Sequence, residues 1–551
     1  MLLPKLFTTL KAYTREQFVA DIMAGIIVGI VALPLAIAFG IASGVTPEKG
    51  LITAIVAGFL ISALGGSRVQ IGGPTGAFVV IVYGIVHHYG TEGLIAATFL
   101  AGILLIIMGF SKMGDVIKFV PHPLIVGFTS GIALIIFSSQ VKDFLGLSMT
   151  EVPVEFIHKW VAYVAHLGGV NTDAIAIGIG TVLITALWPR VSRKIPGSLM
   201  ALVLSALVVK IFHLPVETIG SRFGDLPASL PAPHFPVFSF SLIQQLIKPA
   251  FTIAILGAIE SLLSAVVADG MIGGRHRSNM ELVAQGAANI ASSLFGGIPA
   301  TGAIARTATN IKNGGRTPVA GMVHAVTLLL ILYFAGKWAK LIPLSCLAGI
   351  LVIVSYHMSE WRSFISLLRG PKSDVVILLI TFLLTVLVDL TVAIEIGMVL
   401  SAFLFMRRMS LATRFLRVTN GGASSQTDEE SLASHVEAPE GVEIYEIEGP
   451  LFFGVSHQFE EAMRTVAKKP KVQILLLRYV PVIDATGLHS LRQFYKKCKA
   501  GRIQLLLSGV HSQPLKALKS SGLYDEIGSE NIFPHIEDAV QYARQYVSAA
   551  S

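Results

Sequence analysis

The stretch Gly72-Gly73-Pro74-Thr75-Gly76 interrupts a long apolar region, and Gly296-Gly297-Ile298-Pro299-Ala300-Thr301-Gly302 interrupts it again further along the chain. Both motifs combine glycine with proline, which breaks regular helices, and each opens a short apolar segment. They lie at matching depths in two halves of the region: Pro74 comes 54 residues after Ala20, and Pro299 comes 51 residues after Lys248. Broken apolar segments at corresponding positions of two halves indicate the binding site of a secondary transporter.

The two breaks also free backbone N–H groups. Helix N-termini carry partial positive charge and attract anions, so we expect the two motifs to face an anion near the middle of the bilayer. Thr75 and Thr301 add a hydroxyl beside these N–H groups. Threonine is also a good helix N-cap, and the two roles share one geometry.

The composition predicts a membrane protein with a polar C-terminal region. Hydrophobic residues make up 53% of the 551-residue chain and charged residues only 14%, against about 25% in soluble proteins. The net charge of +8 is spread between apolar segments with no basic stripe, so we expect no nucleic-acid partner. The chain has no zinc-ligand spacing, Walker motif, Rossmann glycine pattern or nucleophile elbow, so no enzyme and no cofactor are predicted.

Apolar periodicity divides the region from Ala20 to Ser410 into fourteen segments. A crossing helix needs about 20 apolar residues, and the segments that begin at Pro74 and Gly302 are too short to cross alone. An odd number of segments in each half makes the two halves inverted repeats. The predicted segments are 20–41, 50–66, 74–88, 93–110, 123–140, 172–189, 197–213, 250–269, 280–295, 302–312, 317–336, 342–357, 373–389 and 391–408.

Charge sets the expected orientation. With the N-terminus in the cytoplasm, the inside segments and their flanks hold 18 Lys and Arg residues and the outside ones hold 8. This excess follows the positive-inside rule, so we expect a multi-pass protein of the inner (plasma) membrane with both termini cytoplasmic. The eight outside residues are Lys49, Lys142, Lys159, Lys210, Arg222, Lys248, Lys337 and Lys340.

The C-terminal region has a different pattern. Polar and small residues predict a linker over 411–440, and alternating strands and amphipathic helices then predict a small α/β domain. Strands are expected at 442–447, 472–477 and 503–507, with helices near 456–468, 487–499, 512–521 and 535–547. The expected domains are a cytoplasmic N-terminus (1–19), a membrane domain (20–410, with repeats 20–213 and 248–410), the linker (411–440) and the α/β domain (441–548).

Three polar residues in the apolar region are candidates for function. Glu260 lies in the middle of a predicted span, where a carboxyl group is costly and should face the protein interior or a wet cavity. Ser264 follows one helical turn later on the same face, so the pair suits a cation, or Glu260 alone can carry a proton. Arg306, five residues after Thr301, can pair with Glu260, attract an anion, or do both in turn. A purely structural hydrogen bond or ion pair is the alternative for each.

Several motifs resemble the SulP family of anion transporters. They are the entry segment Asp21-Ile22-Met23-Ala24-Gly25-Ile26-Ile27-Val28-Gly29, Gly73-Pro74-Thr75, Gly257-Ala258-Ile259-Glu260-Ser261-Leu262, and Pro299-Ala300-Thr301-Gly302-Ala303-Ile304-Ala305-Arg306-Thr307-Ala308-Thr309-Asn310. In the C-terminal domain, Val482-Ile483-Asp484-Ala485-Thr486-Gly487-Leu488 resembles the signature loop of a STAS domain. The resemblance covers nearly the whole chain and keeps the order of the motifs.

The resemblance implies a core domain and a gate domain built from seven-plus-seven inverted repeats, with an anion site between the third and tenth spans. Carried over, the site residues are Thr75, Gly76, Ala77 and Phe78 on one side, Thr301, Gly302, Ala303 and Arg306 on the other, and Phe39 on the wall. Glu260 and Ser264 match positions that bind sodium in the bicarbonate carriers of the family, where Asp and Thr stand. Glu at the first position goes with proton coupling in similar members.

The resemblance leaves the substrate open. Sulfate-type members carry Pro-Gln and Tyr where this chain has Pro34-Leu35 and Phe39, which weakens the case for sulfate. The chain resembles most the bacterial carriers of C4-dicarboxylates, followed by bicarbonate carriers. We therefore expect proton-coupled symport of a small anion. The alternatives are sodium-coupled bicarbonate symport, an anion channel and a membrane-anchored regulatory STAS protein.

The resemblance also implies partners. A homodimer in the lipid bilayer is expected, together with a soluble protein partner at the STAS domain. Thr486 matches the hydroxyl residue that is phosphorylated in related STAS proteins, where added charge changes docking. The alternative is that Thr486 only caps a helix that begins at Gly487.

Overall fold

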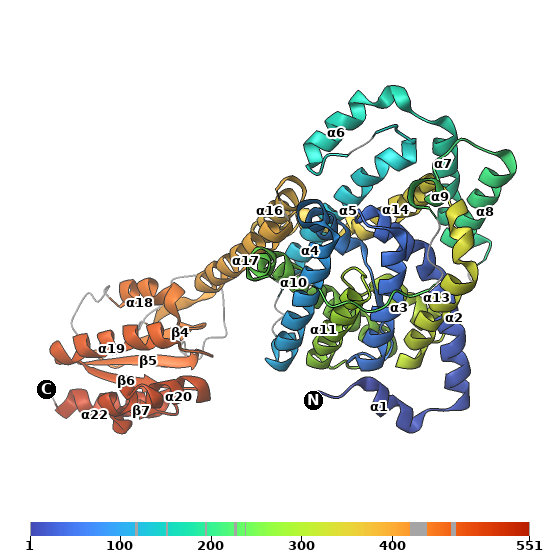
Figure 1. Cartoon of the computed structure of the whole chain (residues 1–551). Helices are drawn as coiled ribbons and strands as arrows, with labels where there is room; N and C mark the ends of the chain where they lie inside the picture. The colour runs from blue at the N-terminus through green and yellow to red at the C-terminus, as the bar shows by residue number, and fades with distance from the viewer. Residues whose placement is uncertain are drawn as a thin grey trace. The chain divides into compact units, whose positions relative to one another are not determined.

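The computed structural model describes residues 2–115, 120–149, 152–192, 196–224, 229–236, 239–388, 390–418, 438–463 and 470–549. The chain divides into two compact units, Met1–Val399 and Leu400–Ser551, and the division falls inside helix α17 (Leu390–Ala412). The first unit is built from apolar helices and the second from an α/β sheet (Figure 1). The predicted class, a polytopic helical membrane region followed by a small α/β domain, is confirmed.

The first unit contains most of the helices and two very short strands. Its elements are α1 (Lys5–Thr9), α2 (Arg15–Ala42), α3 (Pro47–Leu64), β1 (Gly72–Gly73), α4 (Gly76–Phe110), α5 (His122–Leu145), α6 (Phe156–Ala165), α7 (Thr172–Leu187), α8 (Gly197–Phe212), α9 (Ile219–Phe223), α10 (Phe240–Ile272), α11 (Ser278–Leu294), β2 (Thr301–Gly302), α12 (Ile304–Lys312), α13 (Pro318–Ala335), α14 (Leu344–Met358), α15 (Trp361–Leu368), α16 (Lys372–Leu387) and α17.

A helix coincides with each predicted apolar segment. The predicted segments 74–88 and 93–110 fall in α4, which is broken at Gly90, where φ is +70° and ψ is −176°. In the described part of the chain, nine helices are long and apolar enough to cross a membrane. Fourteen crossings therefore remain a prediction, because the short α12 and several helices of intermediate length fall outside that number.

The helices of the first unit pack in two groups. In the first, which we call the motif group, α11 and α10 pack on α4, α13 packs on α2 and α3, and α12 packs on α10. In the second, the partner group, α5 packs on α14 and α16, and α7 packs on α8 and α14 (Figure 1). The groups meet where α2 contacts α8 and α14 and where α4 contacts α5, and we call this boundary between the groups the seam.

The contact between α4 and α11 depends on two facing glycines. A Cβ atom on Gly286 would lie 2.5 Å from the carbonyl oxygen of Gly102, and a Cβ on Gly102 would lie 2.7 Å from the carbonyl oxygen of Gly286. No side chain fits at either position unless the backbones separate. Small residues let helices approach closely in membrane proteins, where apolar burial alone does not drive helix association.

The second unit contains a five-stranded sheet of order β3-β4-β5-β6-β7. β3 pairs antiparallel with β4, and the remaining neighbours are parallel. One apolar cluster joins the sheet to α18–α21, and a second joins it to α22, so that α19 and α22 cover opposite faces (Figure 1). The elements are β3 (Arg414–Val418), β4 (Val442–Glu448), α18 (Ser456–Ala462), β5 (Val472–Tyr479), α19 (Ala485–Ala500), β6 (Gln504–Ser508), α20 (Ser512–Ser520), α21 (Leu523–Ile527), β7 (Ile532–Phe533) and α22 (Ile536–Ala549).

The three predicted strands and four predicted helices of this domain are present, with shifted ends. The prediction missed β3, whose residues 414–418 were assigned to the linker. This strand adds to the edge of the sheet through its pairing with β4, a long-range partner that local sequence does not reveal. Residues 419–437 of the predicted linker and residues 464–469 of the predicted first helix lie outside the described residues.

Gly286→Ala should lower the stability of the protein, because a methyl group at this position must push α4 and α11 apart. Overpacking of this kind costs about 1–3 kcal/mol. Gly84→Ala is the matched control: it lies in α4, the other helix of this contact, and no atom lies within 4 Å of a Cβ there. The midpoint of thermal unfolding in detergent should fall for the first variant and stay constant or rise for the second. Equal midpoints would show that the crossing tolerates the methyl group.

Candidate functional site

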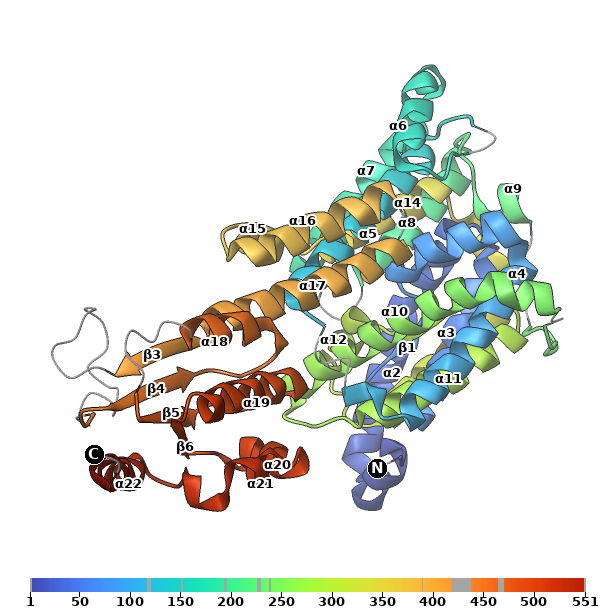
Figure 2. The same cartoon turned by 90° about the vertical axis from the view of Figure 1, so that its left-hand side faces the viewer.

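The two broken motifs meet in the middle of the motif group. β1 and β2 pair antiparallel, with Gly72 opposite Gly302 and Gly73 opposite Thr301. The Ala303 N–H also donates to the Ile71 carbonyl oxygen at 2.8 Å. β1 contacts α3 and β2 contacts α10, and Figure 2 shows β1 deep among the helices. This pairing joins the two halves of the unit and satisfies backbone groups that would otherwise be unpaired inside the protein.

A helix leaves each strand. α4 begins at Gly76, after Thr75, and α12 begins at Ile304, after Ala303. The first N–H groups of any helix have no partner within that helix. In α4 the third of them, the Phe78 N–H, bonds to the Thr75 carbonyl at 3.3 Å. The pairing of β1 with β2 thus brings together two helix N-termini from the two halves of the unit.

Both motif threonines bond to α10. The Thr75 hydroxyl donates to Glu260 Oε2 at 2.9 Å, and the Thr301 hydroxyl donates to the Gly257 carbonyl oxygen at 2.8 Å. Gly257 and Glu260 lie one turn apart on α10. Neither threonine side chain caps the helix that follows it, as the simple capping alternative would require: the Thr75 side chain makes no cap bond to α4, and the N-cap of α12 is Ala303. The hydroxyls instead fix the starts of α4 and α12, which we call the half-helices, to one face of α10.

Arg306 lies buried beside the first motif, with 3% of its surface exposed. Its Nη2 donates to the Pro74 carbonyl oxygen. Among the residues that the structure describes, its Nη1 has no hydrogen-bond partner. Gly73, with φ +144°, lies so close that a Cβ there would be 2.6 Å from this nitrogen. Of the roles open to Arg306, an ion pair with Glu260 is not formed within the described chain, and a buried cationic donor remains unused.

Glu260 and Ser264 share a face of α10 but bind different partners. Glu260 accepts from Thr75, the residue before α4. The Ser264 hydroxyl donates to Thr307 Oγ1 in α12 at 3.3 Å, and the same Thr307 oxygen accepts from the Ile71 N–H at 3.0 Å. The two predicted coupling residues therefore contact the two half-helices separately.

The remaining predicted residues divide between the seam and the interior. Phe39 is buried, and its Cε1 lies 3.5 Å from the Cβ position of Gly76, with Met358 and Ile136 of the partner group close by. Phe78 instead directs its ring at Gly257 of α10. Ala77 is buried beside it. Gly302 and Ala303 are also buried.

Sequence reasoning missed the residues that hold the motifs in place. Asn289 of α11 donates to the Ala300 carbonyl and accepts from the Ala300 N–H, both at 2.9 Å, as a neighbouring strand would. Gln70 covers Gly302, where a Cβ would overlap its amide, and donates to Ser261 at 2.9 Å. Glu281 accepts from the N–H groups of Gly66 and Ser67 at 2.8 and 3.0 Å.

A signal for these residues was present in the sequence. Glu281, Gln285 and Asn289 recur every four residues within the apolar segment 280–295, which places them on one helix face. Gln285 donates to Glu281 at 3.0 Å along this face. A polar stripe on a buried helix indicates that it binds backbone groups of a neighbour.

The STAS signature loop begins α19 at Ala485. Asp484 is its N-cap and accepts from the Gly487 N–H at 2.7 Å. The alternative that Thr486 caps a helix beginning at Gly487 is therefore wrong, because the preceding aspartate already does so. Thr486 itself is exposed in the first turn.

Comparison with known proteins assigns the chain to a family. The model of the sulfate permease family matches residues 18–381, which contain both motifs, and the STAS domain model matches residues 433–539. The chain belongs to the sulfate permease family. It is a multi-pass membrane protein and an anion transporter with a C-terminal STAS domain, as the motifs predicted.

Relatives match over nearly the whole chain. A putative sulfate transporter of Bacillus subtilis, YvdB, is 45% identical over 96% of this chain and 98% of its own length. The bicarbonate transporter BicA of Picosynechococcus is 31% identical over 91% of this chain and 90% of its own. Among solved structures, SLC26A9 has the same fold, with a TM-score of 0.87 at 18% identity over 100% of this chain and 93% of its own. The match to the solved transmembrane domain of BicA covers 69% of this chain and 98% of that domain, with 33% identity and a TM-score of 0.64.

Asn289→Ala should destabilise the region where β1 and β2 pair, because it leaves the buried N–H and carbonyl of Ala300 without partners. Each unsatisfied buried group costs about 1–3 kcal/mol. Asn313→Ala is the control, since within the described residues the Asn313 amide donates to the Thr309 carbonyl alone, in a half-buried turn. Thermal unfolding in detergent should show a clearly larger fall in midpoint for Asn289→Ala. Equal shifts would mean that water or a rearranged side chain satisfies Ala300.

Proposed function

We propose that this member of the family moves a small oxyanion across the membrane by proton-coupled symport with alternating access. One observation carries the proposal: Arg306 and Glu260 bind adjacent residues, Pro74 and Thr75, at the start of α4. A buried cation and a half-buried carboxyl group thus act on the same helix N-terminus. This arrangement suits a site in which an anion and a proton are bound together.

The anion would bind between the two half-helices. The first N–H groups of α4 and of α12 have no partner within their own helices, and each N-terminus adds partial positive charge. The unused Nη1 of Arg306 supplies a charged donor of the kind that carboxylates and other oxyanions favour. Phe39 lines the seam beside Gly76. Thr301 and Thr75 position the helices through α10 and would not bind the anion with hydroxyls that are already donated.

Glu260 would carry the coupling proton. When it is ionised, its negative charge next to the start of α4 opposes an anion there. Protonation removes that charge, so proton and anion each favour the binding of the other, and the coupling is reciprocal. The same protonation weakens the charge-assisted hydrogen bond from Thr75, which links the proton load to the position of α4.

The two groups of helices supply the moving parts. The site faces the seam where Gly76 approaches Ile136 of α5 and Met358 of α14. Movement of the motif group against the partner group would expose the site to one side of the membrane and then the other. The excess of basic residues in the inside segments supports cytoplasmic termini, and hence a cytoplasmic STAS domain.

The substrate is proposed as a class. Relatives carry the names of sulfate and bicarbonate transporters, and the sequence motifs also resemble those of dicarboxylate carriers. All three substrates are small oxyanions, which helix N-termini and an arginine recognise in the same way.

Sodium-coupled bicarbonate symport is the second candidate. It is favoured by the likeness to BicA over most of both chains and by the one-turn spacing of Glu260 and Ser264. The separate hydrogen bonds of these two residues support the proton instead, because a sodium site needs their oxygens to converge on one ion.

Glu260→Gln should abolish uptake that is driven by an inward proton gradient, because the amide keeps the shape and loses the titrating group. The measurement is uptake into proteoliposomes of labelled succinate, bicarbonate or sulfate from the outside solution. It is made first under an inward proton gradient and then under an inward sodium gradient. Glu395→Gln is the control, since Glu395 is an exposed carboxyl group of α17. Full proton-driven uptake by the Glu260 variant would refute the coupling role, and uptake that requires sodium at fixed pH would favour the second candidate.

Arg306→Gln should weaken anion binding by roughly tenfold or more, as expected for loss of a charged hydrogen-bond donor. Gly73→Ala should weaken it as well, because the new methyl group displaces the guanidinium while the charge stays. Arg316→Gln is the control: Arg316 bonds the Ile311 and Gly315 carbonyls in the turn after α12. The concentration dependence of uptake reports the affinity. Unchanged affinity in both test variants would place the anion elsewhere.

A further inference from the structure

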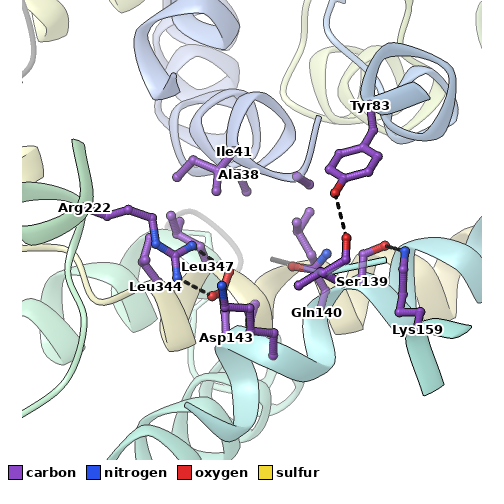
Figure 3. Close-up of a pocket in the computed structure, with 15 residues that line it drawn as sticks. Ala38, Ile41, Tyr83, Ser139, Gln140, Asp143, Lys159, Arg222, Leu344 and Leu347 are labelled. Atoms are coloured by element: carbon purple, nitrogen blue, oxygen red, sulfur yellow. Dashed lines mark hydrogen bonds and ion pairs between the residues drawn. The ribbon is translucent and has the colours of Figure 1, made fainter. Parts of the chain in front are cut away.

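A polar cavity lies on the seam between the two groups of helices. Its volume is about 140 Å³. Ala38 and Ile41 of α2 and Tyr83 of α4 line one side, and residues of α5, α6, α9 and α14 line the other (Figure 3). It is therefore bounded by helices of both groups.

Lys159 of α6 is the unusual residue of this cavity. Only 4% of its surface is exposed. Its ammonium group donates to the Ser139 hydroxyl at 3.1 Å and lies 5.9 Å from the centre of the Tyr83 ring. Within the described residues, no carboxylate forms an ion pair with it. Burial lowers the pKa of Lys159 to about 8, so the group stays mostly charged at neutral pH although little around it offsets the charge. An ammonium has three donors, and Ser139 accepts from one.

The acidic groups near the cavity are engaged by another residue. Arg222 binds Asp143 at 2.8 Å and Glu217 at 2.5 Å. In Figure 3 Arg222 and Asp143 lie on one side of the cavity, and Lys159 and Ser139 lie on the other. Lys142 also lines the cavity. The cavity thus has an excess of positive charge, and buried charge is stable only when it is compensated.

The cavity continues the seam that holds the half-helix site. Tyr83 lies seven residues after Gly76 on α4, which is about 10 Å along a helix. Ala38 adjoins Phe39 on α2, and Gln140 follows Ile136 by one turn on α5. The same residues, Phe39 and Ile136, flank Gly76 in the half-helix site. An anion that leaves this site towards the C-terminal end of α5, where α6 follows, would next meet Lys159.

We propose that this cavity is an outer anion subsite, in which Lys159 binds the transported oxyanion between the external solution and the half-helix site. Ser139 holds the ammonium group in place while its own hydroxyl donates to the Ile135 carbonyl. The inference rests on the proposed function for the identity of the anion. Lys159 would supply two N–H donors and the uncompensated charge, and Ser139 would orient the ammonium. Tyr83 and the apolar residues of α2 and α14 would exclude water around the ion, which strengthens the attraction.

A competing role for Lys159 is that of a latch. It links α6 to α5 through Ser139 and lies over Tyr83 of α4, so it also joins the partner group to the motif group. A latch would affect how fast the seam opens, whereas a subsite would affect how strongly external anion is captured. These two effects differ in a kinetic experiment.

The test compares Lys159→Gln, Lys159→Arg and Ser139→Ala with the wild-type chain. Labelled sulfate and bicarbonate are supplied to intact cells, which present the outer face, and to inverted membrane vesicles, which present the inner face. Lys210→Gln is the matched control, because it removes one exposed charge from the same predicted side at the end of α8. Immunoblots of the membrane fraction correct each rate for the amount of protein.

The subsite predicts a KM from outside that is raised roughly tenfold in Lys159→Gln, the effect of one charged hydrogen-bond donor. The KM at the inner face should stay unchanged, Lys159→Arg should restore most of the affinity, Ser139→Ala should lie between, and Lys210→Gln should match the wild type. If Lys159→Gln does not reach the membrane, the Arg and Ser139 variants carry the test.

Two results would overturn the subsite. An unchanged external KM, or an equal rise at both faces, would show that Lys159 does not bind external anion. A higher maximal rate at constant KM would establish the latch instead. These results differ from failure of the proposed function, in which the wild-type chain itself shows no saturable uptake of either anion.

Discussion

The antiparallel pairing of Gly72–Gly73 with Thr301–Gly302 is the constraint on which the membrane unit depends. Each motif breaks a helix inside the protein, where an unpaired N–H or carbonyl is expensive. The two breaks pair with each other, and side chains satisfy the groups that the short strands cannot reach. Asn289 serves Ala300 on one side, and Asn310 donates to the Val69 carbonyl on the other. The cost of breaking two helices is thus met locally, and two N-termini remain available.

The buried charged groups of the unit differ in how fully they are satisfied. Glu281 accepts from two backbone N–H groups, the Gln285 amide and the Ser261 hydroxyl, which makes it a structural anchor. Arg306 and Lys159 are equally buried but retain donors that nothing in the described chain accepts. A buried donor without a partner is destabilising unless a ligand completes it. This contrast separates positioning residues from candidate anion contacts.

The seam between the groups has a different character from the interior of the motif group. Inside that group, helices touch through backbone, as where Gly102 and Gly286 face each other. Across the seam the contacts are longer side chains, such as Met358 and Ile136 against Gly76. Both polar sites lie on this seam. Side-chain contacts can slide or exchange, whereas a glycine crossing cannot without separating backbones.

The sequence by itself determined the membrane class, the position of the helices, the two breaks and the α/β domain, because apolar periodicity, glycine and proline act over short stretches. It also singled out Glu260 and Arg306 as candidates, because charge is rare in apolar segments. Tertiary structure decided the partners. From local sequence, the expected partner of Arg306 was Glu260 or an anion. In the fold, Arg306 Nη2 donates to the Pro74 carbonyl oxygen, and Glu260 accepts from the Thr75 hydroxyl. It also paired β3 with β4 inside a predicted linker, and it buried Lys159 between the two groups. The bonds from Arg306 to Pro74 and from Asn310 to Val69 join residues 232 and 241 positions apart, and only the packing of distant helices brings such partners within bonding distance.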